Sequence, residues 1–234
     1  MGTSRQPDIL TGRAGLNVEI AQMGALAEKQ LSDALLAFER RDTTLANAIR
    51  AADTRIDALH LKVEQNAVAI LQNDKMDAAG LREILTAIKV ASELERVGDL
   101  AKNVAKRTLV ISAAPVFDVV AGVVRMGRRS LLQLSHVLDA YGSKNLAQAQ
   151  AVWQGDDEID EMYNSLFQET LKAMMADPAN ATACTHLAFV AKNFERVGDH
   201  ATNIAESVHF LLTGDQLIGD RPKGDETATT AVSI

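Results

Sequence analysis

The sequence has little of several residue types, and each shortage excludes a class of protein. The single cysteine, Cys184, rules out an internal disulfide and a zinc site built on cysteines. This lone thiol and an amino terminus without an apolar signal core predict a cytoplasmic location. Acidic residues outnumber basic ones by 31 to 24, which argues against nucleic-acid binding. Because no apolar run is long enough to cross a bilayer, membrane insertion is not expected.

Proline and aromatic residues are also scarce, and their scarcity favours helices. Four prolines and an aromatic fraction of 4% leave Ala, Leu, Val and Ile to form the core. Steps of three and four separate the apolar residues of segment 87–108, as in an amphipathic helix. Asp177 before Pro178 is typical of a helix start, and Pro115 marks another. We therefore expect an all-α protein with six long helices at residues 16–40, 44–72, 78–112, 115–141, 145–176 and 179–213.

The two halves of the sequence repeat one another. The run Glu-Arg-Val-Gly-Asp at 95–99 recurs 100 residues later, and Asp-x-x-Ile-Asp at 53–57 recurs at an offset of 103. Each half therefore holds three helices in the same order. We expect two tandem three-helix bundles, at 16–112 and 115–213, with disordered ends at 1–15 and 214–234.

Each half contains two pairs of acidic residues spaced four apart, with an asparagine one turn further on. This spacing places both carboxylates of a pair on one helix face, where their like charges repel. Hard cations prefer carboxylate oxygens, so a metal ion is the simplest compensation. The pairs lie outside the apolar seams of their helices, which predicts metal sites on the surface. The candidate ligands are Asp53, Asp57, Glu95, Asp99 and Asn103 in the first half, and Asp156, Asp160, Glu195, Asp199 and Asn203 in the second.

Two other interpretations of the acidic residues remain open. They could be solvated faces of a scaffold that binds no metal, although the pairs are retained in both halves while neighbouring outward positions differ. They could also serve a ferritin-like metal oxidase, because Asp57-x-x-His60 and Glu206-x-x-His209 have di-iron spacing. The repeat counterparts of these histidines are Tyr163 and Leu109, which weakens that interpretation. Because no nucleophile–base pair or phosphate loop is visible, we do not expect an enzyme.

The duplicated motifs resemble those of the PhoU family of phosphate-system accessory proteins. The resemblance covers residues 16–213 and rests on the paired Glu-Arg-Val-Gly-Asp runs, their downstream asparagines and the Met-Gly at 23–24 and 126–127. It implies a negative regulator of the phosphate-starvation response that links the phosphate ABC transporter to a two-component sensor histidine kinase, often as a homodimer. It also implies multinuclear surface clusters of divalent or trivalent ions (Fe, Zn, Mg or Mn) at the ten candidate ligands. A ferritin-like metal oxidase or metal-storage protein is the alternative.

Overall fold

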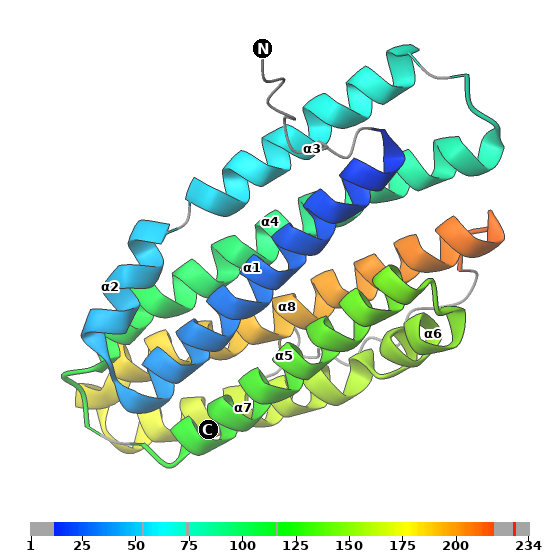
Figure 1. Ribbon diagram of the computed structural model, residues 1–234. Helices are drawn as coiled ribbons and strands as arrows, with labels where there is room; N and C mark the ends of the chain where they lie inside the picture. The colour runs from blue at the N-terminus through cyan, green and yellow to red at the C-terminus, as the bar shows by residue number, and fades with distance from the viewer. Residues whose placement is uncertain (1–11, 53, 74, 116, 218–226, 228–234) are drawn as a thin grey trace, which may run out of the picture.

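The computed structural model describes residues 12–52, 54–73, 75–115, 117–217 and 227. These residues form α-helices and one 3-10 helix, with no strand among them (Figure 1). The all-α expectation is therefore confirmed. The helices are α1 (Arg13–Arg40), α2 (Thr43–Ala52), α3 (Thr54–Asn73), α4 (Ala78–Ile111), α5 (Val119–Ser143), α6 (Leu146–Gln154), α7 (Asp156–Ala176), η1 (Pro178–Asn180) and α8 (Ala181–Thr213).

Two of the expected long helices are each divided in two. Segment 44–72 is taken up by α2 and α3, and Asp53 between them lies outside the described residues. Segment 145–176 is taken up by α6 and α7, which Gly155 separates. Glycine weakens a helix interior, and the amide of Gly155 bonds instead to the carbonyl of Val152, three residues back. In each half, the second expected helix is therefore a short helix followed by a longer one.

The ends of two other helices differ from the expectation. The first helix begins at Arg13, so residues 13–15, which were expected in a disordered end, are helical. The fourth expected helix begins at Val119 and not at Pro115. For the terminal segments, 1–11, 218–226 and 228–234 lie outside the described residues.

The duplication extends to the turns that follow α1 and α5. Arg41 and Lys144 both have left-handed backbones, with φ of 55° and 53°. The next residues cap the following helices: Asp42 Oδ1 accepts from the amide of Leu45 at 2.9 Å, and Asn145 Oδ1 accepts from that of Gln148 at 3.1 Å. The two halves therefore share their chain path as well as their motifs.

Four long helices form the centre of the molecule, and two flank them. Helix α1 packs on α4 of its own half and on α5 of the other half, and α8 packs on α5 of its own half and on α4 of the other half (Figure 1). Helix α3 covers α1 and α4, and α7 covers α5 and α8. The buried apolar side chains of both halves join in one core. The packing of α4 on α8 thus holds the two halves together.

The contact between α1 and α5 is reciprocal. A Cβ atom at Gly24 would lie 2.9 Å from Cδ2 of Leu138, and one at Gly127 would lie 2.7 Å from Cδ1 of Leu35. Both the glycines and the leucines are repeat counterparts. A contact in which each half uses the same two positions is the mark of two-fold symmetry. The halves are therefore related by a pseudo-two-fold axis.

Candidate functional site

The glycine of each Glu-Arg-Val-Gly-Asp run brings two acid-bearing helices together. A Cβ atom at Gly98 of α4 would lie 2.9 Å from Cδ1 of Ile56 of α3, and one at Gly198 of α8 would lie 3.1 Å from Cδ1 of Ile159 of α7. Each isoleucine directly precedes an aspartate of its own helix, Asp57 or Asp160. The duplicated glycine thus sets α3 against α4, and α7 against α8, where the acidic pairs lie.

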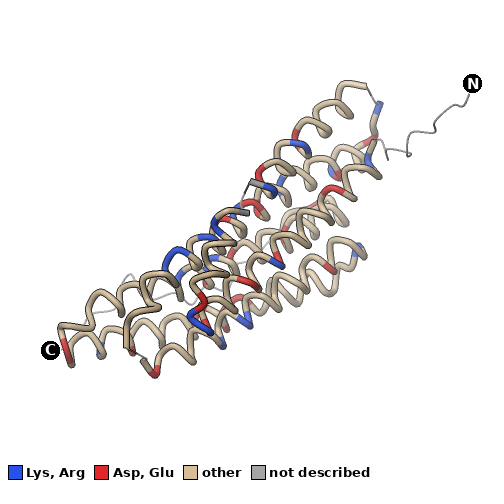
Figure 2. The backbone as a smooth tube through the Cα atoms, turned by 60° about the vertical axis from the view of Figure 1, so that its left-hand side comes forward, with Lys and Arg blue, Asp and Glu red and all other residues tan. Residues whose placement is uncertain are grey.

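We call Asp57, Glu95 and Asp99 the first acidic cluster, and Asp156, Asp160, Glu195 and Asp199 the second acidic cluster. Asp53 lies outside the described residues. Figure 2 shows Asp and Glu residues distributed along the helices of the bundle. The second cluster corrects the expectation of surface ligands, because Asp156, Asp160 and Glu195 are only 2%, 5% and 4% exposed. Helix α7 packs over this face of α8 and removes it from solvent, which helical periodicity alone does not reveal.

Glu195 is the most perturbed carboxylate of the second cluster. Its Oε1 lies 2.7 Å from Nζ of Lys192, one turn earlier on α8. Its Oε2 is buried and has no hydrogen-bond partner. Burial raises the pKa of Glu195 to about 7, and Asp199 and Asp160 add to the rise although Lys192 opposes it. Glu195 is therefore a buried carboxylate with one oxygen that makes no hydrogen bond, as expected of a cation ligand.

The other members of the second cluster are held by neighbours. Asp156 Oδ1 accepts a hydrogen bond from Oγ1 of Thr202 at 2.9 Å. Asp156 opens α7 directly after the break at Gly155, so this break helps to place it against α8. Asp199 is partly buried on α8, one turn beyond Glu195. The four carboxylates therefore come from two facing helices.

The first acidic cluster is more open. Asp57 is exposed, and the side chains of Glu95 and Asp99 are 21% and 42% exposed. Arg96 lies 3.4 Å from a carboxylate oxygen of Glu95 and 3.8 Å from one of Asp99. Its own side chain is 59% exposed, and such ion pairs contribute little. The first cluster thus matches the expected surface location, while the second does not.

The two asparagines differ in what they contact. Asn203 donates from Nδ2 to Oε2 of Glu93 on α4 at 3.1 Å, and Nδ1 of His200 lies 2.6 Å from the same oxygen. Asn103 is partly buried on α4. The network of Glu93, His200 and Asn203 joins the two halves and was not predicted. Its signal in the sequence is a departure from the repeat, because the counterparts of Glu93 and His200 are Asn193 and Leu100.

The described residues hold no group of three or more His, Cys, Asp or Glu side chains that converge on one metal position. The donor chemistry of the second cluster nevertheless suits a hard cation, since its ligands are carboxylates and one oxygen of Glu195 is buried and unpaired. The histidines of the di-iron interpretation contact other groups. His60 Nε2 lies 3.7 Å from Glu64, and His209 Nδ1 lies 3.1 Å from the carbonyl oxygen of Asp215.

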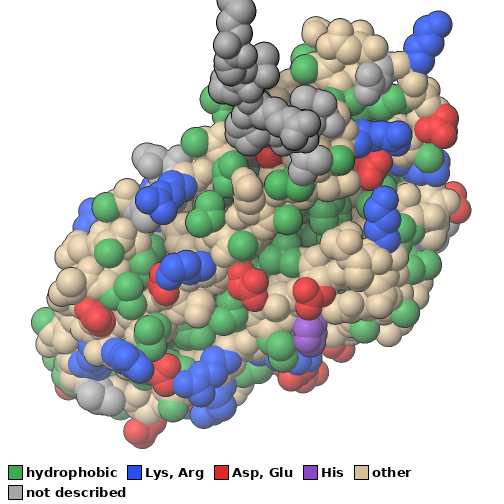
Figure 3. Space-filling model, in the orientation of Figure 1, with side chains coloured by type: hydrophobic (Ala, Val, Ile, Leu, Met, Phe, Trp, Pro, Cys, Tyr) green, Lys and Arg blue, Asp and Glu red, His purple; other side chains and the backbone are tan. Residues whose placement is uncertain are grey.

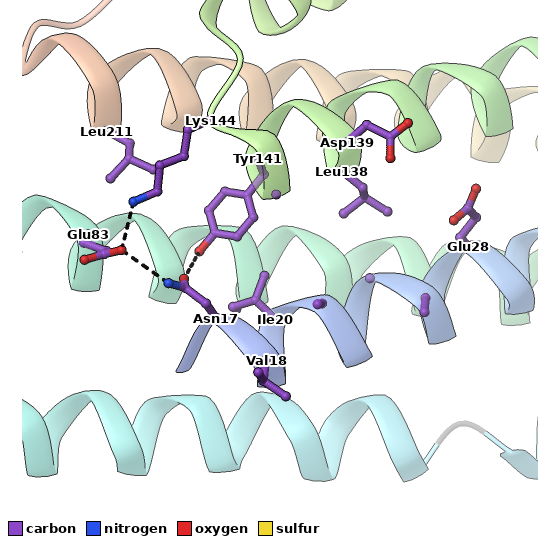
Figure 4. Close-up of a pocket in the computed structure, with 14 residues that line it drawn as sticks. Asn17, Val18, Ile20, Glu28, Glu83, Leu138, Asp139, Tyr141, Lys144 and Leu211 are labelled. Atoms are coloured by element: carbon purple, nitrogen blue, oxygen red, sulfur yellow. Dashed lines mark hydrogen bonds and ion pairs between the residues drawn. The ribbon is translucent and has the colours of Figure 1, made fainter. Parts of the chain in front are cut away.

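A separate cavity of about 430 Å³ lies between α1 and α5 (Figure 4). At one end Glu83 Oε1 lies 3.3 Å from both Nδ2 of Asn17 and Nζ of Lys144, and the hydroxyl of Tyr141 donates to Oδ1 of Asn17 at 3.2 Å. Burial, helped by Glu83, raises the pKa of Tyr141 above its usual range. The walls of the cavity are largely apolar, and the face of the molecule in Figure 3 mixes hydrophobic and charged side chains. This end of the cavity is therefore a set of mutually paired polar groups.

Within the described ranges, no helix has the length and apolar character that a bilayer span requires.

Known proteins resemble this chain over most of its length. The model of the PhoU domain matches residues 20–108 and 123–208, one match in each half. The phosphate-specific transport system accessory protein PhoU homolog of Caulobacter vibrioides is 46% identical over 213 residues, which cover 91% of this chain and 93% of that protein. The homolog of Rhizobium meliloti is 42% identical over 215 residues, with 92% and 91% covered.

Solved structures agree with the sequence comparison. The crystal structure of PhoU from Pseudomonas aeruginosa matches with a TM-score of 0.84 at 30% identity, covering 86% of this chain and 97% of that one. The phosphate transport system regulatory protein PhoU from Streptococcus pneumoniae matches with a TM-score of 0.81 at 26% identity, covering 88% and 97%. With a family match in each half and relatives of this identity along nearly the whole chain, this protein belongs to the PhoU family.

Proposed function

We propose that this protein is an accessory regulator of phosphate transport that represses the phosphate-starvation response while phosphate is abundant. The observation that carries the proposal is the match over 91% of the chain to a relative named as a phosphate-specific transport system accessory protein. In this proposal the protein works by binding and not by catalysis. Its partners are the phosphate ABC transporter and a two-component sensor histidine kinase, which it links on the cytoplasmic side.

The fold suits such an adaptor. Its two halves share one core and present related surfaces about a pseudo-two-fold axis, so two partners can contact one rigid body. Interfaces of transient regulatory complexes are often small and polar, and each contact can be weak. A homodimer would present every surface twice and raise the effective affinity through avidity. We include dimer formation in the proposal for this reason.

The proposal also assigns metal binding to the two acidic clusters. In the second cluster the ligands would be Asp156, Asp160, Glu195 and Asp199, and Asn203 lies one turn beyond them on α8. In the first cluster they would be Asp53, Asp57, Glu95 and Asp99, with Asn103 in the matching place. A bound cation would offset the repulsion within each acidic pair and connect two helices of one bundle. The unpaired Oε2 of Glu195 supports this assignment.

Replacing Asp99 and Asp199 with alanine together should lower the metal content of the purified protein and leave its helix content unchanged. Neither aspartate belongs to the apolar core, and each takes part in an i, i+4 acidic pair that costs a few tenths of a kcal/mol. Elemental analysis gives the metal content, and circular dichroism reports the fold. Exposed Asp157, changed to alanine, is the matched control. A double variant with full metal content would refute the ligand assignment.

Deleting the gene should derepress phosphate-scavenging genes in cells that have abundant phosphate. The measurement is alkaline phosphatase activity in phosphate-rich medium, with the intact gene restored as the control. Restoration should be weaker when Glu95, Asp99, Glu195 and Asp199 are all changed to the corresponding amides. The regulatory role fails if phosphatase activity in the deletion strain, with any paralogue also deleted, stays fully repressed by phosphate.

A further inference from the structure

Helix α5 carries opposite charges at equal distances from an exposed leucine. Leu132, near the middle of the helix, is 44% exposed. Arg125 stands seven residues before it and Asp139 seven residues after it, and both are exposed. Seven residues are nearly two helical turns, so the three side chains lie on one face, with each charge about 10 Å from the leucine along the axis. This face of α5 therefore has a positive end, an apolar centre and a negative end.

The chain itself does not use these two charges. Within the part of the chain that the structure describes, the side chains of Arg125 and Asp139 make no ion pair. Their repeat counterparts on α1, 103 residues earlier, are Gln22 and Leu36, which are neutral. The charges therefore break the pseudo-two-fold symmetry of the halves, and the duplicated framework does not explain them.

The neighbouring part of α1 adds an open surface beside α5. Ala21 and Ala25 are small, exposed residues on the α1 wall of the cavity between the two helices. Glu28 on this wall and Asp139 on the opposite wall lie at the end of the cavity away from Glu83 (Figure 4). Like Asp139, the side chain of Glu28 makes no ion pair with any described residue. The face of α1 and α5 thus combines a largely apolar cavity with two unpaired carboxylates.

We propose that this face of α1 and α5 binds a second copy of the chain, with the two α5 helices antiparallel and crossing at Leu132. The inference rests on the homodimer that the proposed function includes. In an isologous dimer both copies use the same patch. Antiparallel packing about Leu132 therefore brings Arg125 of each copy to Asp139 of the other, whereas parallel packing would place like charges together.

A second set of charges fits the same arrangement. Arg128 stands four residues before Leu132 and reaches towards α1, where it pairs with Glu39 at 2.6 Å. The two side chains are 61% and 38% exposed, so this pair is weak and Arg128 can change partner. The two-fold axis places α1 of one copy over α1 of the other, so Arg128 of the second copy comes over the cavity, on the side of Glu28. The second copy thus brings a cation to each unpaired carboxylate.

Sedimentation equilibrium of the full chain tests this pairing by exchanging its charges. Arg125→Glu and Asp139→Arg should each weaken the dimer about tenfold, because each change replaces two complementary contacts by two repulsive ones. A chain with both changes should regain the wild-type affinity, since the charges have only exchanged places. An equimolar mixture of the two single variants should also dimerise, because both contacts of the mixed dimer are complementary.

The matched control is Arg50→Glu on α2, where Arg50 is exposed and lies outside this face. It changes the net charge as Arg125→Glu does and should leave the dimer as it is. Single variants that dimerise like wild type, or a double variant that does not regain affinity, overturn the pairing while leaving dimer formation intact. A wild-type chain that stays monomeric at every concentration overturns the homodimer and this inference with it, and the phosphatase measurement still tests the regulatory role.

Discussion

Replacing Glu195 with glutamine should stabilise the metal-free protein by about 3 kcal/mol above neutral pH. Burial raises the pKa of this carboxyl from 4.5 to about 7 in the folded chain. A group with a raised folded pKa favours folding fully below its unfolded pKa and loses that contribution as the pH rises through the folded one. Wild type should therefore lose stability between about pH 4.5 and 7, whereas the glutamine variant, which cannot ionise, should not.

Urea unfolding at a series of pH values, with a chelator present, measures this effect. The two proteins should have similar midpoints well below pH 4.5, where Glu195 is protonated in both the folded and the unfolded state, and should diverge as the pH approaches 7. Glu95→Gln is the matched control, because the carboxylate of Glu95 occupies the same place in the repeat and is more exposed. If the stabilities of wild type and Glu195→Gln depend on pH in the same way across this range, ionisation of the buried carboxyl does not destabilise the folded protein.

Helix content and helix order could be predicted from the sequence because they depend on local rules. Asp177 does cap the short helix at Pro178, accepting from the amide of Ala179 at 2.9 Å. The break at Gly155 could not be predicted, because a glycine inside a helical pattern is tolerated or not according to the packing around it. The same limit applies to Pro115, since proline permits a helix start and does not require one at that residue.

The acidic residues could be identified from the sequence, but their burial could not. Periodicity tells which residues share a face of α8, while burial depends on the helix that covers this face, here α7. The contact between Glu93 and His200 joins residues 107 positions apart, so it depends on the antiparallel packing of α4 on α8. The ion pair of Lys192 with Glu195 could have been predicted from the sequence, because Lys192 stands three residues before Glu195 and differs from its counterpart, Ser92.

Truncating Phe194 to alanine should cause the largest loss of stability among these substitutions, about 3–5 kcal/mol. Its ring is fully buried on α8 and lies under α5, since a Cβ atom at Gly127 would be 2.9 Å from its Cζ atom. Its carbonyl oxygen accepts from Oγ of Ser130, also on α5, at 2.9 Å. Removing the ring leaves a cavity at the contact between these two helices, and close backbone packing limits how far they can collapse into it.

The matched control is Phe189→Ala on the same helix, where the ring is 49% exposed and faces the guanidinium of Arg107 at 4.1 Å. Loss of that contact should cost about 1 kcal/mol or less. Phe194→Leu, which places the residue of the first half in the second, should fall between the two alanine variants. Chemical unfolding of the three variants gives the comparison. Equal losses of stability for Phe194→Ala and Phe189→Ala would mean that the packing of α5 on α8 does not depend on the buried ring. Because Glu195 follows Phe194 directly, α8 would then need another anchor to keep the second acidic cluster against α7.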